Sequence, residues 1–209
     1  MSHLAQINLD RAAAARQGLH GFYEWHSLSW KLFPEKKKDD KRDFITRLDI
    51  AENEFKFTVL SADKPEKPSW CPSEGWKEKK VPESFFQKNR YLFKIFANPT
   101  KTLSGRDPKG NKKKNGSHYA ITKREELRSW IVQKSEQNGF RVLEEPEMEM
   151  SPPVFHKLFR KKDEGVLVGV EFKGCLEVTD QAKFLKVANE GIGRARGFGF
   201  GMLVLKPIS

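Results

Sequence analysis

The sequence predicts an α+β fold made of two tandem ferredoxin-like (RRM-like) domains with the element order βαββαβ. Two observations predict this class. Stretches with apolar residues at helical spacing alternate with shorter segments that mix apolar and charged residues, as half-exposed strands do. The second half shows the complete order β-α-β-β-α-β, with a basic β-hairpin, whereas the first half shows β-α-β-β and an irregular remainder. We therefore expect an N-terminal domain at residues 1–88 and a C-terminal domain at residues 89–209.

The first half begins with a predicted strand, AQINL at residues 5–9. The spacing of its apolar residues predicts a helix over Leu19–Phe33, which Pro34 and the charged run KKKDDKR end. Two strands, Asp43–Ile50 and Glu54–Ser61, should follow. Lys64–Ser84 contains four prolines, so we expect it to be irregular or weakly helical.

The second half begins with a predicted strand at Tyr91–Ala97, followed by the basic loop TLSGRDPKGNKKKNGSH at residues 102–118. Thr122 and Glu125 have the spacing of a capping box, and Gly139 should end the helix that they begin. The remaining predicted elements are a strand at Phe140–Met148, a hairpin of Phe155–Arg160 and Val166–Val178, a helix from Thr179 or Asp180 to Val187 that Gly191 ends, and a last strand at Met202–Lys206.

The composition favours a polyanionic partner. Lys and Arg number 39 against 28 Asp and Glu, which gives a net charge of +11 and a pI of about 9.6. Nucleic acid is then a better candidate than an anionic membrane. The apolar runs are too short to span a bilayer, and the N-terminus lacks the pattern of a secretion signal. Two isolated cysteines form neither a disulfide framework nor a zinc site, so we expect a reduced, cytoplasmic protein without a metal or cofactor.

The segment GIGRARGFGFG at residues 191–201 is the most distinctive motif. Glycine permits positive φ and close approach of a ligand, and arginine offers a fork of donors to phosphate. A dinucleotide fingerprint is excluded, because this segment follows a helix and precedes a strand and has the spacing GxGxxxG. We interpret it as a phosphate-contacting loop in which Gly193, Arg194, Arg196 and Gly197 contribute to RNA binding.

The first predicted helix carries the best candidate for proton chemistry. Tyr23, His26 and Trp30 share one helical face. RNA supplies its own nucleophile, the 2′-OH, so cleavage without metal needs a base, an acid and a cation for the phosphate. A histidine with a pKa of about 6.5 suits either proton-transfer role. The residues alone nevertheless favour a bystander, because most histidines so placed are packed or exposed without a catalytic role.

The order of five sequence segments resembles that of a known family. FYEWHSLSWKLFP, YLFKIFANPTKT, DPKGNKKK, VEFKGCLEVTD and GIGRARGFGFGMLVLKP occur in the order seen in CasE, the CRISPR repeat-cleaving endoribonuclease of the type I-E Cascade complex. The resemblance covers nearly the whole chain. It implies two ferredoxin-like domains and metal-independent cleavage of repeat RNA to mature crRNA with a 2′,3′-cyclic phosphate. His26 matches the catalytic histidine of the family and Tyr23 the tyrosine one turn before it; Lys31, Lys161 and Lys162 are candidates for the phosphate-stabilising cation, with Arg194 and Arg196 behind them.

The resemblance also implies partners. The enzyme is expected to stay on the 3′ stem-loop of the crRNA, beside other Cascade subunits that include the backbone subunit next to the hairpin. We expect the hairpin residues Lys157, Arg160, Lys161 and Lys162 to line one strand of the stem, and the loop residues Lys109, Lys112, Lys113 and Lys114 to extend this contact or to face another subunit.

Two other functions remain open at this level. One is a non-cleaving RNA-binding subunit that caps the 3′ hairpin of a guide RNA. The other is a ribosomal or RNA-chaperone protein, explained by charge alone. Whether His26 acts as acid or base is open too. If the protein is the endoribonuclease that the resemblance implies, Arg194→Ala should chiefly weaken RNA binding and His26→Ala should chiefly stop RNA cleavage.

Overall fold

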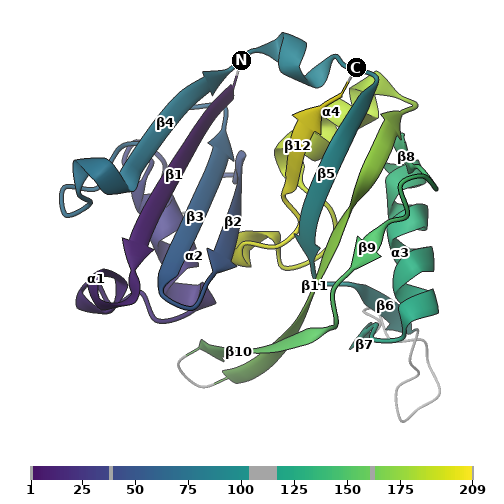
Figure 1. Ribbon diagram of the computed structural model, residues 1–209. Coiled ribbons are helices and arrows are strands. Elements are labelled where there is room, and N and C mark those ends of the chain that lie inside the picture. The colour runs from purple at the N-terminus through teal and green to yellow at the C-terminus, as the bar shows by residue number, and fades with distance from the viewer. Residues whose placement is uncertain (1, 38–39, 104–116, 161–162, 209) are drawn as a thin grey trace.

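The computed structural model describes residues 2–37, 40–103, 117–160 and 163–208. Antiparallel sheets and the helices packed on them form a mixed fold, which confirms the α+β part of the prediction (Figure 1). The first sheet has the strand order β2-β3-β1-β4. Its strands are β1 (Ser2–Asp10), β2 (Phe44–Ile50), β3 (Glu54–Ser61) and β4 (Trp76–Val81).

The second sheet has the order β10-β11-β5-β12, and two short strands, β8 and β9, also pair with β11. Every pairing in it is antiparallel. Its strands are β5 (Arg90–Ala97), β8 (Phe140–Val142), β9 (Glu149–Met150), β10 (Val154–Arg160), β11 (Asp163–Val178) and β12 (Leu203–Pro207). A separate two-stranded ribbon consists of β6 (Thr100–Leu103) and β7 (Ser117–Ala120).

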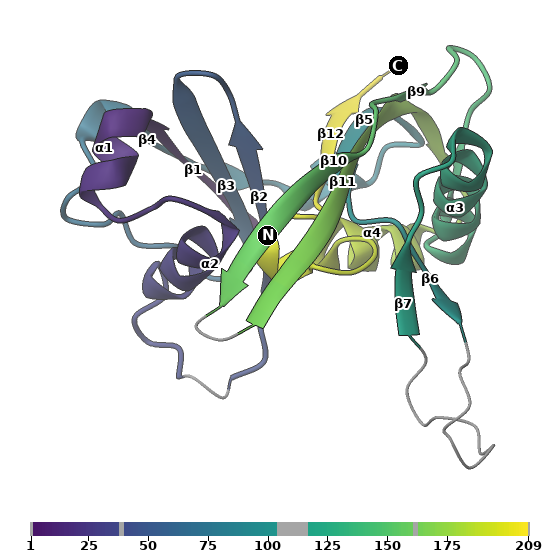
Figure 2. The same ribbon diagram turned by 90° about the horizontal axis from the view of Figure 1, so that it is seen from below.

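The strand β11 is 16 residues long and serves two purposes. Its C-terminal part pairs with β5 inside the sheet, from Val170 opposite Ala97 onward. Its N-terminal part pairs with β10 and forms a hairpin that extends past the sheet (Figures 1 and 2). This hairpin contacts helix α2 of the first half, so it links the two halves of the chain.

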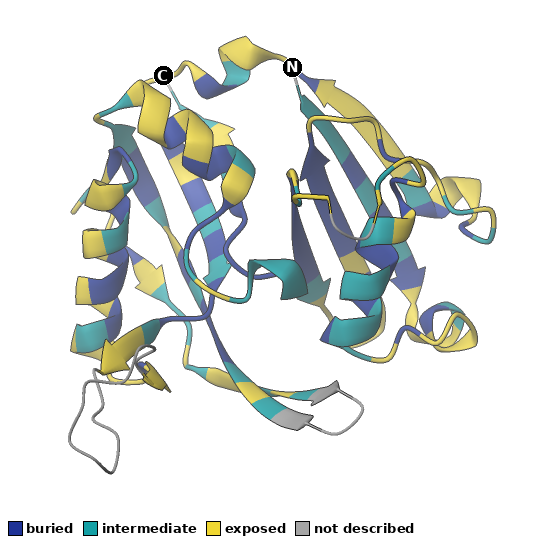
Figure 3. Cartoon of the chain, turned by 180° about the vertical axis from the view of Figure 1, so that it is seen from behind, coloured by how far each residue is buried: buried dark blue, intermediate teal, exposed yellow. Residues whose placement is uncertain are grey.

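Four helices complete the fold: α1 (Arg11–Arg16), α2 (Phe22–Lys31), α3 (Arg124–Gln137) and α4 (Gln181–Glu190). Each half has its own apolar core between helices and sheet (Figure 3). In the first half, Trp25 of α2 is 1% exposed and packs against Phe55 and Phe57 of β3, with ring centroids 5.7 and 5.0 Å apart. Burial of such an aromatic side chain contributes about 2–3 kcal/mol, which fixes α2 on its sheet.

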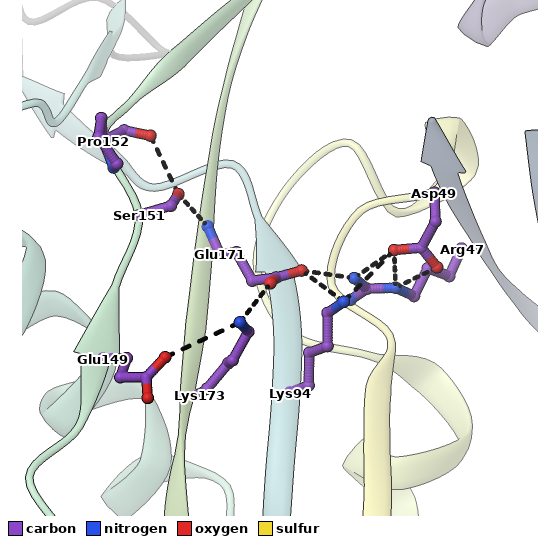
Figure 4. Close-up of polar contacts among 8 residues, drawn as sticks. All are labelled: Arg47, Asp49, Lys94, Glu149, Ser151, Pro152, Glu171 and Lys173. Carbon is purple, nitrogen blue, oxygen red and sulfur yellow. Dashed lines mark hydrogen bonds and ion pairs between the residues drawn. The ribbon is translucent and has the colours of Figure 1, made fainter. Parts of the chain in front are cut away.

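The two halves are joined by apolar and by charged contacts. Ile45 and Leu60 of the first sheet share a buried cluster with Ala188 and Met202 of the second half. Beside it, Arg47 of β2 is 2% exposed. Its guanidinium donates to Asp49 on its own strand at 2.6 Å and to Glu171 of β11 at 2.7 Å (Figure 4). We call this group the Arg47 strut.

The local structure differs from the sequence prediction in four places. Lys64–Ser84 is not irregular throughout, because Trp76–Val81 forms β4 and pairs with β1. A short helix, α1, follows β1 directly and was not foreseen; Asp10 caps it by accepting from the backbone N–H of Ala13 at 2.6 Å.

The capping box at Thr122 was also wrong. The N-cap of α3 is Lys123, whose side chain makes no capping hydrogen bond. The strand expected at Phe140–Met148 is shorter than predicted and ends at Val142. The helix cap at Asp180 and the helix ends at Gly139 and Gly191 are confirmed.

Candidate active site

The candidate site is built around His26 on α2. The carboxylate of Glu24 accepts a hydrogen bond from the backbone N–H of Gly21 at 2.9 Å, which satisfies a donor at the start of the helix. Phe22, Trp25 and Leu28 are buried and hold one face of α2 on the sheet. His26 lies at the margin of this face and is half-buried, so its ring is fixed by the protein while it keeps access to solvent.

His26 contacts the glycine-rich segment from the other end of the chain. Its Nδ1 lies 2.8 Å from the carbonyl oxygen of Gly197, and its ring centroid lies 5.1 Å from that of Phe198. A carbonyl oxygen only accepts, so Nδ1 carries the proton of this hydrogen bond. In the neutral ring, Nε2 therefore bears the free lone pair and is the atom that accepts a proton.

The surroundings lower the pKa of His26. Burial is the main cause, the hydrogen bond to Gly197 acts in the opposite direction, and the positive charge of Arg42 lowers the pKa further. The neutral ring then predominates at neutral pH, because the ordinary histidine pKa is about 6.5. His26 is thus held in the tautomer and the protonation state of a general base.

The glycines of residues 191–201 serve the packing of the protein itself. The backbone at Gly199 and Gly201 has φ of 85° and 84°, a conformation that favours glycine. A Cβ atom at Gly201 would stand 2.2 Å from the carbonyl oxygen of Ile192, and one at Gly199 would stand 2.9 Å from the backbone nitrogen of Leu48 in β2. The segment crosses between the two halves so closely that only glycine fits.

The candidate RNA-binding residues of this segment have different surroundings. Arg194 is exposed. The guanidinium of Arg196 donates to the carbonyl oxygen of Glu190 at 2.9 Å, at the C-terminal end of α4. Gly193 packs near Trp130: a Cβ atom at Gly193 would stand 3.2 Å from Cζ2 of the Trp130 ring. Gly197 lies against His26, and its carbonyl oxygen accepts the hydrogen bond from the imidazole. We had predicted only that this glycine gives the RNA backbone room to approach.

Tyr23 and Lys31 lie on another side of α2. Together with Ser27 and Trp70 they line a shallow surface hollow. Because 3.6 residues make one helical turn, Lys31 points about 140° away from His26 around the helix axis, and Tyr23 about 60° away. Lys31 is exposed and Tyr23 is half-buried. The structure therefore places Tyr23 nearer to His26 than Lys31 around this helix.

The basic hairpin is described only in part. Lys157 is exposed on β10, and the backbone of Arg160 ends that strand. Lys161 and Lys162 lie outside the described residues, as do the loop residues Lys109, Lys112, Lys113 and Lys114.

Sequence reasoning missed Arg42 and His156. Arg42 belongs to the charged run that we interpreted only as a helix end. His156 of β10 stacks edge-on against Phe22 and Phe96, with centroids 4.9 and 5.7 Å away. Its Nε2 is buried and has no hydrogen-bond partner among the described residues, and burial lowers the pKa of His156. Neither residue has a sequence pattern that would have revealed its position.

Other kinds of site find little support in the described part of the chain. It holds no group of three or more His, Cys, Asp and Glu side chains arranged to bind a metal. Cys71 and Cys175 are both buried and free, as expected of packing residues. Within the same ranges, no helix has the length and hydrophobicity to cross a membrane.

Comparison with known proteins decides the family. A family model described as "CRISPR associated protein" matches residues 2–207. The chain belongs to this family. It is 28% identical over 219 residues to CRISPR-associated endoribonuclease Cse3 of Thermus thermophilus, covering 98% of this chain and 99% of Cse3. It is 26% identical over 204 residues to CRISPR system Cascade subunit CasE of Escherichia coli, covering 96% and 99%.

Solved structures of family members have the same fold. A complex of Thermus thermophilus Cse3 with an RNA representing a pre-cleavage state matches with a TM-score of 0.78 at 25% identity, covering 99% of both chains. Cse3 bound to a 19-nucleotide RNA matches with a TM-score of 0.76. Cas6e of Escherichia coli, 24% identical, matches in fold with a TM-score of 0.70. The predicted resemblance to the CasE family is confirmed.

Proposed function

We propose that this protein is an endoribonuclease that binds the stem-loop of CRISPR repeat RNA, cleaves it without metal and stays on the crRNA as a Cascade subunit. The observation that carries the chemistry is the hydrogen bond from His26 Nδ1 to Gly197, which leaves a neutral Nε2 as the base. The relatives support the substrate and the partners, since one is a CRISPR endoribonuclease and the other a Cascade subunit.

The proposed reaction follows from this tautomer. Nε2 of His26 takes the proton of a ribose 2′-OH, and the 2′-oxygen forms a bond to the adjacent phosphorus. The bond from phosphorus to the 5′-oxygen breaks, and that oxygen takes up a proton. The products are a 2′,3′-cyclic phosphate and a 5′-hydroxyl. Proton transfer by a positioned side chain accelerates such a step by about 10²–10⁴-fold.

We further propose that the two halves are ferredoxin-like domains at residues 1–88 and 89–209. The support is the order of the four main strands of each sheet. In β2-β3-β1-β4 and in β10-β11-β5-β12, the strand that comes first in the chain lies between those that come third and fourth. The first half lacks a full second helix and has a 3-10 turn at Ser73–Gly75 instead. The helix that carries His26 thus belongs to one domain, and the carbonyl that orients it to the other.

RNA binding is assigned to basic surfaces of the second domain. Lys157 is exposed on β10. We assign Lys157, Arg160, Lys161 and Lys162 to phosphates of the stem, and Lys109, Lys112, Lys113 and Lys114 to a longer contact or a Cascade subunit. The helical stem of RNA is recognised mainly by shape and backbone contacts. Within the first domain, Tyr23 and Lys31 are proposed as groups that position the RNA and its phosphate. We place this activity in the cytoplasm, as expected from the sequence.

One experiment tests the proposal. The protein is incubated with its own repeat RNA in EDTA, and product is measured for the wild type, for His26→Ala, and for RNA with a 2′-deoxy nucleotide just 5′ of the cut. We expect cleavage by the wild type alone, with RNA affinity retained in His26→Ala. Cleavage that survives either change contradicts the mechanism. Tight binding without any cleavage would instead identify a capping subunit.

A further inference from the structure

Arg42 lies against Gly197, the residue whose carbonyl orients His26. It sits in the loop between α2 and β2 and is half-buried. Its Nη1 is 2.9 Å from the point where a Cβ at Gly197 would stand, and His26 Cε1 and Nδ1 are 3.3 and 3.4 Å from the same point. The absent side chain of Gly197 thus leaves a small space that the guanidinium and the imidazole share.

A second cation stands beside Arg42. Arg196 precedes Gly197 in the chain, and its guanidinium is anchored to the carbonyl oxygen of Glu190. The two arginines are close enough to repel each other: burial lowers the pKa of Arg42, and the positive charge of Arg196 lowers it further. Burial of like charges costs free energy that the fold has to offset elsewhere.

The described acids nearest to Arg42 in sequence are engaged by other groups. The carboxylate of Asp43 accepts from Lys36 at 2.7 Å, and that of Asp40 accepts from the backbone N–H of Lys37 at 2.8 Å. Among the residues that the structure describes, no hydrogen bond or ion pair joins Arg42 to a carboxylate. The pair Arg42–Arg196 is therefore a half-buried positive site that has no paired carboxylate among the described residues.

We propose that Arg42 and Arg196 form an anion subsite that holds the non-bridging oxygens of the scissile phosphodiester, with Arg42 as an additional catalytic residue. This inference rests on the proposed function. The planar guanidinium fork suits phosphate oxygens, and its charge opposes the negative charge that the pentavalent phosphorus gains. Arg42 also lies on the same side of α2 as His26, whereas Lys31 points elsewhere.

The first test needs no RNA. The His26 imidazole is followed by NMR while inorganic phosphate is added to the wild type, Arg42→Ala, Arg42→Lys and the control Arg90→Ala, whose exposed arginine pairs with Glu177. Phosphate in the subsite should raise the pKa of His26 saturably in the wild type and the control, and less in Arg42→Ala, with partial recovery in Arg42→Lys. An equal response in Arg42→Ala and the wild type would overturn the subsite.

The second test uses repeat RNA in single turnover at saturating protein. Arg42→Ala should slow cleavage by about 10²-fold, the usual effect of losing one preorganised donor to a developing oxyanion, while affinity for the 2′-deoxy analogue changes far less. A phosphorothioate at the scissile phosphate should slow the wild type more than Arg42→Ala, because the variant has already lost the contact to that oxygen. Equal thio effects would contradict the assignment.

The two tests separate the inference from the function beneath it. If the wild type cleaves no repeat RNA but phosphate still titrates His26 through Arg42, the proposed function fails and the anion subsite stands. If the wild type cleaves and Arg42→Ala cleaves equally fast, only the subsite fails. Thermal unfolding serves as the folding control: loss of a cation that is repelled by Arg196 should leave Tm unchanged or raise it, whereas loss of a structural arginine lowers it.

Discussion

At the residue scale, the chemistry of the site depends on how two neighbours set the charge of His26. Burial and Arg42 lower its pKa, and the Gly197 carbonyl opposes them. The cleavage rate should therefore rise with pH and level off below the ordinary histidine value of about 6.5. Arg42→Ala removes one lowering influence, so its rising limb should move to higher pH. Single-turnover rates between about pH 5 and pH 8 measure the rising limb of the wild type and that of Arg42→Ala. A midpoint of the wild-type limb above about pH 6.5 would contradict the role of His26 as the base.

His156 predicts a pH dependence of stability. Burial lowers its pKa and that of His26 in the folded state, while the unfolded chain binds these protons near pH 6.5. Below about pH 6.5 the unfolded state thus holds more protons, so stability should fall as pH is lowered from about 6.5 to the folded-state pKa values. Above about pH 6.5 these residues should cause no further change.

The substitution His156→Phe isolates one part of this effect. Phenylalanine keeps a ring between Phe22 and Phe96 and removes the unpartnered Nε2. We expect a smaller loss of stability between about pH 6.5 and pH 5, and stability at pH 7 that is equal or higher. Urea unfolding at several pH values measures both quantities. An unchanged slope would show that His156 is not protonated on unfolding in this range.

At the element scale, the glycine-rich segment both stabilises the fold and orients His26, and substitutions at different glycines should separate these two roles. Gly201 has positive φ and no room for a side chain, so Gly201→Ala should cost stability, about 2 kcal/mol or more. Gly197 has no positive φ, and a Cβ there would meet Arg42 and His26. Gly197→Ala should therefore reduce cleavage about tenfold or more with little change in Tm. The reverse pattern would show that Gly197 is structural and Gly201 is not.

The elements that the sequence predicted best are those with a buried face. The helix around His26 has buried apolar residues at helical spacing, and most residues of the strands β2 and β3 are buried. The elements that were missed have no such face. The helix α1 has six residues, too few for a period, and β4 is an edge strand with four exposed positions in a proline-rich stretch. Such a strand is defined by its neighbour β1 rather than by its own sequence.

The site was predictable in part for the same reason. His26 and Tyr23 share a helix, so local spacing and family motifs reveal them. Gly197 is 171 positions away from His26 in the sequence, and Arg42 approaches Gly197 from a third segment. No local pattern encodes a meeting of three segments. The assignment of the glycines to RNA access likewise overlooked their packing against β2, because glycine type alone does not tell which partner approaches.

At the scale of the whole molecule, the net charge of +11 predicts the salt dependence of RNA binding. Lysine and arginine contacts release counterions from the RNA, so the logarithm of affinity should fall linearly with the logarithm of salt concentration. The 2′-deoxy repeat RNA allows Kd to be measured without cleavage. Arg194→Ala, which removes an exposed arginine beside the site, should raise Kd and make the slope less steep by about one. A flat salt response of the wild type would exclude phosphate contacts as the main source of affinity.

The Arg47 strut connects the halves that bring His26 and Gly197 together. Burial by itself would raise the pKa of Asp49 and Glu171, but hydrogen bonds and positive charge from Arg47 and Lys94 outweigh it and lower both pKa values. The stability that these acids contribute is complete above their ordinary pKa values of about 4 and is lost as pH falls below them. This window lies well below that of the histidines.

A double-mutant cycle tests whether the strut also serves catalysis. Arg47→Met removes the buried cation from two half-buried carboxylates and leaves Lys94 beside them, so we expect a loss of up to about 3 kcal/mol. In the Arg47→Met background, Glu171→Gln should reduce stability less than it does in the wild type, with a coupling energy of about 1–3 kcal/mol. The exposed pair Arg90–Glu177 should have a coupling energy under about 1 kcal/mol. Because Leu48, one residue after Arg47, packs on Gly199, a loosened strut should slow cleavage at temperatures where the variant is still folded. Unchanged cleavage there would mean that the strut stabilises the fold without positioning the Gly197 carbonyl on His26.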